Sequence, residues 1–89
     1  MNVRVQYTQK SLRDLQKLGP ATARVIVQKI RFYTEQENPL RYAKKLKQPF
    51  DDLYRFRIGN YRAVFELGNT GHMLFLTILK IGDRKDVYE

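Results

Sequence analysis

Residues 53–67, LYRFRIGNYRAVFEL, constrain the fold more than the rest of the chain does. Apolar and polar side chains alternate on both sides of Gly59-Asn60, and a period of two is typical of a β-strand with one buried face. A Gly-Asn pair between two such runs is typical of a type II′ hairpin, because glycine accepts positive φ at the first central position. We therefore expect an antiparallel hairpin with strands at 53–58 and 61–67.

The turn also determines which residues of the two strands face each other, because a two-residue loop sets the register of a hairpin. With Gly59 and Asn60 in the turn, Arg57 lies opposite Arg62. The buried face is expected to carry the apolar side chains Tyr54, Phe56, Ile58, Tyr61, Ala63, Phe65 and Leu67. Arg55 then joins Arg57 and Arg62 on the opposite face, which we expect to be exposed.

Three arginines on one face of a hairpin have an energetic cost. Like charges directly opposite each other destabilise a pair of strands by roughly 0.2–1 kcal/mol. The same cluster suits a phosphate, because each guanidinium can donate two hydrogen bonds to an oxyanion. The alternative is a solvated face with Glu66 as counter-ion, since exposed charges usually contribute little. The residues alone leave both interpretations open.

The N-terminal part of the chain predicts a strand followed by two helices. Polarity alternates over residues 2–7, and Thr8 is suited to accept a hydrogen bond at the start of a helix. Gly19-Pro20 separates the two helices, because proline is favoured at the first helical position. The second helix is expected to end near residue 37, before Pro39. The apolar faces of the helices are expected to consist of Leu12, Leu15 and Leu18, and of Val25, Ile26, Ile30 and Tyr33.

The remaining segments complete a single α+β domain over residues 1–89. Residues 40–52 predict a loop, and Gly68–Gly71 a loose turn. Residues 73–81 are apolar at almost every position, so we expect this strand to lie inside the sheet. The expected order is β-α-α-β-β-β, with room for one further strand, and a helical hairpin covers one face of an antiparallel-rich sheet.

The chain is strongly basic, with 17 Lys and Arg against 9 Asp and Glu and a net charge of +8. Residues 1–50 carry eleven basic and three acidic side chains, so the excess lies in the first half. Such an excess indicates a polyanion as partner: nucleic acid, an anionic membrane surface or an acidic protein. The segment RYAKKLK, residues 41–47, suits RNA phosphates through counterion release, or else is a solvated basic loop.

Several classes of site are excluded by residue type. The chain has no cysteine and one histidine, His72, so neither a disulfide nor a zinc cluster is expected. We expect no metal and no cofactor. The opening residues MNVRVQY contain no long apolar run, so we expect no signal peptide and no membrane helix, and a cytoplasmic protein.

The tail after the last predicted strand adds two candidate residues to the arginine cluster. Gly82 lets the chain turn back across the sheet face. Arg84 would bring another guanidinium, and Tyr88 is suited to stack on an unpaired RNA base. The alternative for Tyr88 is a terminal aromatic packed on the core.

The motif LYRFRIGNYRAVFEL, followed by an apolar strand and KIGDRKDVY, resembles the RelE/ParE superfamily of type II toxins. The upstream strand and helices, with their LxxL pattern, match as well, so the resemblance covers nearly the whole chain. In the RelE branch it implies a metal-free, ribosome-dependent endoribonuclease that cuts mRNA in the A site. The implied reaction is attack of a ribose 2′-oxygen on the adjacent phosphate.

The resemblance also implies roles for individual residues. Arg55 and Arg57 match basic positions of the first hairpin strand, Arg62 a phosphate-binding arginine, Arg84 a charge-stabilising arginine, and Tyr88 a base-stacking tyrosine. RNA contacts are also expected from Arg41, Lys44, Lys45, Lys47 and Lys85.

The chain departs from the family pattern at two of these positions. Well-known RelE-type sites have lysines where this chain has Arg55 and Arg57, and arginine is not deprotonated in proteins. The general base is therefore open between Asp83, Glu66 and a group of the ribosomal RNA.

Partners and alternatives follow from the same resemblance. It implies a co-encoded RelB-like antitoxin, the ribosome with its mRNA, and operator DNA bound only through the antitoxin complex. The first alternative is a toxin of the ParE branch, which inhibits DNA gyrase without cutting RNA. The second is a non-catalytic domain that serves autorepression with its antitoxin.

Overall fold

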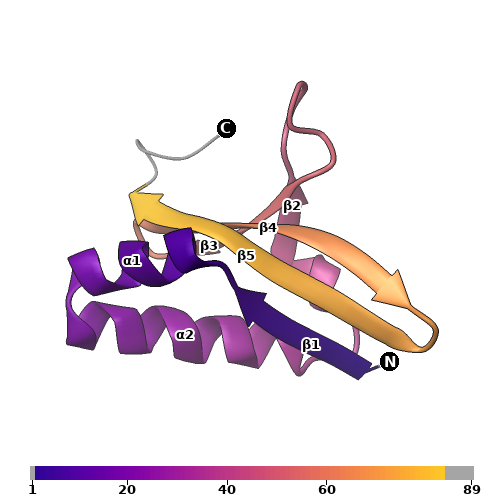
Figure 1. The fold of residues 1–89 in the computed structure, drawn as a ribbon, viewed down its shortest axis with the longest axis horizontal. Coiled ribbons are helices and arrows are strands. Elements are labelled where there is room, and N and C mark those ends of the chain that lie inside the picture. Colours follow the sequence, from indigo (N-terminus) through magenta and orange to yellow (C-terminus); the bar gives the residue numbers. More distant parts are fainter. Residues whose placement is uncertain (1, 84–89) are drawn as a thin grey trace.

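The protein, described here by a computed structural model over residues 2–83, places two helices on one side of a twisted sheet (Figure 1). The elements in chain order are β1 (Asn2–Tyr7), α1 (Gln9–Leu18), α2 (Pro20–Thr34), the short 3-10 helix η1 (Pro39–Tyr42), β2 (Ala43–Lys45), β3 (Tyr54–Ile58), β4 (Tyr61–Thr70) and β5 (Met73–Asp83). No helix in this range is long and apolar enough to cross a membrane.

The sheet has five strands in the order β1-β5-β4-β3-β2. β1 pairs with β5 in parallel, and the other three pairs are antiparallel. The α+β class, the helical hairpin and the antiparallel-rich sheet are therefore confirmed. β5 lies inside the sheet, between β1 and β4, as its apolar sequence predicted.

The helices begin where predicted, but the buried face of each helix differs from the predicted one. Thr8 caps α1 by accepting a hydrogen bond from the N–H of Ser11. Ser11 and Asp14 are buried, because Ser11 donates to the Thr8 carbonyl and Asp14 accepts from β5. Leu12 consequently points outward and is 46% exposed. Val25 of α2 is 57% exposed, so placing Leu12 and Val25 on the core faces was wrong.

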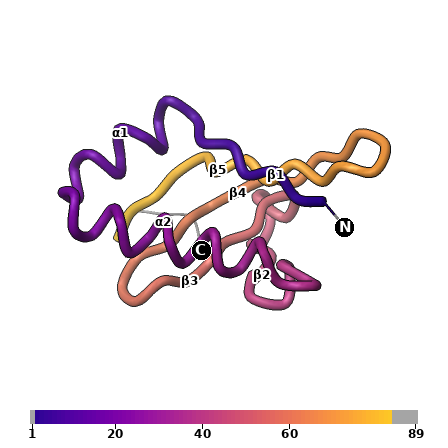
Figure 2. The backbone as a smooth tube through the Cα atoms, turned by 90° about the horizontal axis from the view of Figure 1, so that it is seen from below, coloured from indigo at the N-terminus to yellow at the C-terminus, as the bar shows by residue number. Residues whose placement is uncertain are grey.

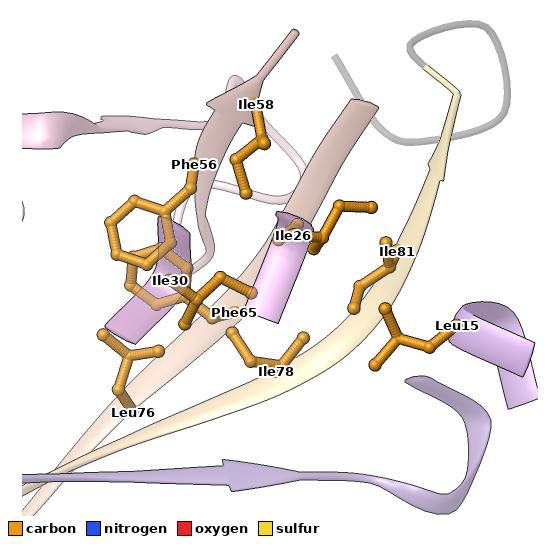
Figure 3. Packing of buried hydrophobic residues seen from close by; sticks show 10 residues of the cluster. Leu15, Ile26, Ile30, Phe56, Ile58, Phe65, Leu76, Ile78 and Ile81 are labelled. Atoms are coloured by element: carbon orange, nitrogen blue, oxygen red, sulfur yellow. The ribbon is translucent and has the colours of Figure 1, made fainter. Parts of the chain in front are cut away.

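The main core fills the space between the helices and the sheet (Figure 3). It consists of Leu15, Ile26, Ile30, Phe56, Ile58, Ala63, Phe65, Leu76, Ile78 and Ile81. Leu46 and Val64 are also buried, yet they lie outside this cluster. Val64 alternates with core residues along β4, so its side chain lies on the face opposite the helices. The loop between β2 and β3 projects on that same side of the sheet (Figure 1).

The ends of several segments differ from the predicted ones. The predicted loop at 40–52 contains η1 and β2, and α2 ends at Thr34 rather than near residue 37. β4 continues through Thr70, so the hairpin turns at Gly71, whose φ is +60°. The β4–β5 hairpin consequently extends past the helices (Figure 2).

A β-bulge in β5 lies next to the arginine positions. Val64 pairs with Lys80, whereas Phe65 pairs with Ile78, so Leu79 is an extra residue on β5. A bulge of this kind changes the face on which the following side chains lie. Here it places Ile81 on the core face and Lys80 on the opposite one, reversing what strict alternation after Ile78 predicts.

Candidate functional site

The predicted hairpin register is confirmed at every pair. Gly59 has a φ of +60° and no non-glycine residue in the described range has positive φ, as a type II′ turn requires. Arg57 faces Arg62, and Arg55 faces Val64. A two-residue turn is closed by a hydrogen-bonded pair, so the next pair, Arg57 and Arg62, is a non-hydrogen-bonded one. In such pairs the side chains lie closest together.

The three hairpin arginines differ in exposure. Arg57 is exposed, whereas Arg55 and Arg62 are only 8% and 5% exposed. The expectation of an exposed cluster was therefore wrong for Arg55 and Arg62. Their rungs lie beside the buried Val64, on the side of the sheet where the β2–β3 loop projects (Figure 1). The low dielectric around a buried guanidinium strengthens its attraction for an anion.

Two further cations join the arginines on this face of the sheet. Lys44 pairs with Arg55 and Lys80 pairs with Val64, so they lie on the same rung. Two residues further along the strands, the next rung on this face holds Arg57, Arg62 and Gly82. We call the set Lys44, Arg55, Arg57, Arg62 and Lys80 the arginine face. Lys80 was missed by the sequence analysis, because only the bulge at Leu79 brings it to this face.

The two carboxylates considered as general base lie away from Arg57 and Arg62. Asp83 pairs with Tyr61, on the face opposite the arginines. It lines a hollow with Asp14 and Lys17 of α1. Glu66 lies on the arginine face, four residues beyond Arg62, which corresponds to about 13 Å along a strand. Within residues 2–83 the structure therefore brings neither carboxylate to the Arg57–Arg62 pair.

The remaining predicted RNA contacts are spread over several surfaces. Arg41, Lys45 and Lys47 are exposed, in η1, at the end of β2 and in the following loop. Lys45 pairs with Tyr54, which places it on the helix side of the sheet. Arg84, Lys85 and Tyr88 lie outside the described residues.

The last part of β5 is held in place by a carboxylate of α1. β1 pairs with β5 only as far as Ile78, so another partner must satisfy the β5 backbone beyond that point. Asp14 Oδ2 accepts the N–H of Ile81 at 3.0 Å, and Asp14 Oδ1 accepts from Lys10 Nζ at 2.6 Å. This contact positions β5 between Lys80 and Gly82.

The sequence model of the ParE toxin of type II toxin-antitoxin system, parDE, matches residues 5–88. The chain belongs to this family. It is therefore a toxin of a type II toxin–antitoxin system, and the resemblance to the RelE/ParE superfamily is confirmed. No curated protein sequence matches this ParE-family toxin.

Solved structures place the ParE-family toxin beside RelE proteins as well. The toxin–antitoxin complex RelBE2 from Mycobacterium tuberculosis contains a chain that is 25% identical, with a TM-score of 0.74 over 94% of this toxin and 100% of that chain. The RelE–RelB complex of Pyrococcus horikoshii is 26% identical, with a TM-score of 0.67 over 98% and 100%. A YoeB/ParE toxin from Agrobacterium tumefaciens, 17% identical, shares the fold with a TM-score of 0.68 over 94% and 99%.

The chemistry available to the ParE-family toxin comes from its cations. Within residues 2–83 no group of three or more His, Asp or Glu side chains is arranged to hold a metal ion. The arginine face instead offers guanidinium groups, partly buried and fixed by strand pairing. Fixed cations of this kind stabilise negative charge that develops on a phosphate during a displacement.

Proposed function

We propose that this ParE-family toxin is an endoribonuclease that cuts mRNA in the ribosomal A site and thereby inhibits translation. The observation that carries the proposal is the pairing of Arg57 with Arg62 on a face that also holds Arg55, Lys44 and Lys80. Like charges that face each other across strands repel, and each guanidinium can donate two hydrogen bonds to a phosphate bound on this face. Because the proposed substrate is ribosome-bound mRNA, the toxin would act in the cytoplasm.

The proposed reaction is a displacement at phosphorus. The ribose 2′-oxygen loses its proton and forms a bond to the adjacent phosphorus, and the bond from phosphorus to the 5′-oxygen breaks. A 2′,3′-cyclic phosphate remains, and the departing 5′-oxygen gains a proton to become a hydroxyl. Charge builds on the non-bridging oxygens during this step, so cations already in position favour the transition state over the ground state.

The three arginines of the arginine face have two different roles in this proposal. Arg57, the exposed member of the central pair, contacts the phosphate directly, and the buried Arg62 and Arg55 add positive potential from beneath it. In this proposal Arg84 stabilises the charge on the departing 5′-oxygen, and Tyr88 orients the base. No side chain of the described range is assigned as general base, so catalysis rests on orientation and electrostatics.

A protein partner belongs to the proposal. RelBE2 and the Pyrococcus RelE–RelB structure are toxin–antitoxin complexes. We propose a co-encoded RelB-like antitoxin, with operator DNA bound only through that complex. An apolar groove between α1 and α2, lined by Leu12, Leu15 and Pro20 among others, supports a docking site for an amphipathic segment.

Inhibition of DNA gyrase is the second candidate function. The matching family model carries the ParE name, and arginines replace the lysines of RelE-type sites at Arg55 and Arg57. A surface of fixed cations would then serve to bind a partner rather than to cleave a phosphate bond.

The two functions separate in one experiment. The toxin is induced in cells, the 5′ ends of mRNA are mapped, and cleavage of DNA by gyrase is assayed in parallel. New mRNA ends in register with the reading frame, lost in Arg57→Ala and kept in Arg24→Ala, support the nuclease. Arg24 is an exposed arginine of α2, so this control removes the same charge elsewhere. Gyrase poisoning without new mRNA ends overturns the proposal.

A further inference from the structure

Three aromatic rings form a surface cluster where α2 approaches η1. Tyr33 and Tyr42 are stacked, with centroids 5.0 Å apart and planes inclined by 19°. Phe32 lies 6.0 Å from Tyr33 and 6.2 Å from Tyr42. Phe32 is 49% exposed and Tyr42 is 41% exposed. We call Phe32, Tyr33 and Tyr42 the aromatic cluster.

Packing against the core accounts for the position of only one of the three rings. Tyr33 packs against the buried Phe56, with centroids 5.0 Å apart, and so anchors the cluster to β3. Phe32 and Tyr42 lie on the outside of Tyr33 and leave nearly half of their surface in water. Neighbouring exposed aromatics of this size usually mark a binding surface, because burial against a partner is favourable.

Cations surround the aromatic cluster. Lys29 Nζ lies 5.7 Å from the centroid of Phe32 and 5.9 Å from that of Tyr33. Arg41 precedes Tyr42, and Lys45 follows in β2, and both are exposed. Over residues 29–45 the chain carries five basic and two acidic side chains. Lysine is depleted in protein–protein interfaces, whereas surfaces for single strands combine basic groups with stacking rings. The combination therefore favours a nucleic acid over a protein.

The aromatic cluster meets the arginine face at Arg57. β2 pairs with β3 only as far as Phe56, so Arg57 lies at the edge of the sheet. Tyr33 donates a long hydrogen bond of 3.5 Å from its hydroxyl to the carbonyl oxygen of Arg57. Burial, with a smaller contribution from Tyr42, raises the pKa of Tyr33, so the hydroxyl keeps the proton that it donates. The exposed Arg57 side chain and the stacked rings therefore lie beside the same edge of the sheet.

We propose that the aromatic cluster stacks bases of the mRNA strand whose phosphate lies on the arginine face. The strand would cross the sheet edge at Arg57 and place successive unpaired bases on Tyr42 and Phe32, with Lys29 and Arg41 beside the backbone. Aromatic stacking accepts every base, so the cluster extends the RNA footprint without selecting a sequence. The inference rests on the proposed function, because it takes the arginine face as the site of the phosphate.

The test measures binding of single-stranded RNA to the whole protein without ribosomes. One RNA of about four nucleotides covers the arginine face alone, and another of about twelve reaches the aromatic cluster. Both carry a 2′-O-methyl group on every ribose, so that the 2′-oxygen cannot attack and binding is measured without cleavage. A third probe has the longer length but lacks bases outside the central positions. Wild type is expected to bind the longer strand at least about fivefold more tightly than the other two.

Substitutions of the ring residues test whether the rings cause the tighter binding of the longer strand. Phe32→Ala with Tyr42→Ala is expected to remove the gain from the longer strand and to leave the short and base-free probes unaffected. Phe32→Tyr with Tyr42→Phe keeps both rings and retains the gain. Val25→Ala is the matched control, because Val25 is an exposed apolar residue of the same helix. Circular dichroism and the melting temperature of each variant establish that it is folded.

Three outcomes overturn the proposal. In the first, the folded double alanine variant binds the longer strand as wild type does. In the second, the variant loses as much affinity for the base-free probe as for the longer strand, so that stacking is not the contact. Alternatively, it binds the longer strand normally but loses affinity for vacant ribosomes or for the antitoxin, and the cluster serves one of those partners. Failure of the proposed function looks different: no mRNA is cut in cells, while the rings still give the gain in affinity.

Discussion

Arg57 lies directly opposite Arg62 in a non-hydrogen-bonded pair of the β3–β4 hairpin, and only Arg57 reaches solvent. The pair therefore combines an exposed guanidinium with a buried one that strand pairing fixes in place. An anion bound to Arg57 would be held by both charges, one through hydrogen bonds and the other through the field in a low-dielectric environment. The two residues are accordingly expected to respond differently to substitution.

Arg62→Ala is expected to lower the free energy of unfolding by about 1–3 kcal/mol, because it removes a long buried side chain and its polar contacts. Arg57 is exposed, so Arg57→Ala should change the free energy of unfolding by no more than about 0.5 kcal/mol. Denaturant unfolding of the two variants makes the comparison. Equal stability would show that Arg62 is not buried in solution.

Asp14→Ala is expected to destabilise the protein by about 1–3 kcal/mol, because the buried N–H of Ile81 loses its acceptor. Lys10→Ala should cost less than about 1 kcal/mol, since Lys10 is 55% exposed and water screens its attraction to Asp14. Asp14→Asn keeps an acceptor and is expected to fall between the two. Thermal unfolding at neutral pH ranks the three variants. A larger loss in Lys10→Ala than in Asp14→Ala would contradict the role of Asp14 as a clamp on β5.

Asp83→Asn is expected to reduce cleavage of mRNA by less than about tenfold, because Asp83 lies on the helix side of the sheet. Loss of a general base reduces the rate by about 10²–10⁴-fold, so the measurement distinguishes an Asp83 that is the base from one that is not. Single-turnover cleavage on programmed ribosomes, measured across pH, provides the rates. A loss of 10²-fold or more would assign the base to Asp83 and would require the end of β5 to rearrange on the ribosome.

Tyr88 lies outside the described residues, and its stacking role stays a prediction. Tyr88→Ala is expected to reduce cleavage more than Tyr88→Phe, because the ring and not the hydroxyl is assigned the main role. Rates of both variants in the ribosome assay decide between ring and hydroxyl. If Tyr88→Phe is as inactive as Tyr88→Ala, the hydroxyl takes part in the chemistry.

The sequence was most informative where local geometry decides the structure. The Gly59-Asn60 turn sets the hairpin register without help from distant contacts, so the Arg57–Arg62 pair could be predicted. The caps at Thr8 and Gly19-Pro20 were readable for the same reason. Each of these features depends on a few neighbouring residues.

The parts of the site that depend on long-range packing could not be predicted. Lys80 reaches the arginine face only because of a bulge, which arises when two strands pair and leaves no sign in an apolar run. β2 is three residues long, too short for a period to be visible. Ser11 and Asp14 turn inward because of hydrogen bonds to Thr8 and β5, and this rotation exposes Leu12.

Single-turnover cleavage of mRNA on programmed ribosomes decides whether the arginine face is a nuclease site, with wild type, Arg57→Ala and Arg24→Ala compared. We expect cuts within the A-site codon for wild type and Arg24→Ala, and a loss of about 10²–10³-fold in Arg57→Ala, because one fixed donor to a developing charge is removed. Cleavage by Arg57→Ala at the wild-type rate, or no cleavage by the wild-type protein, would contradict the proposed nuclease site.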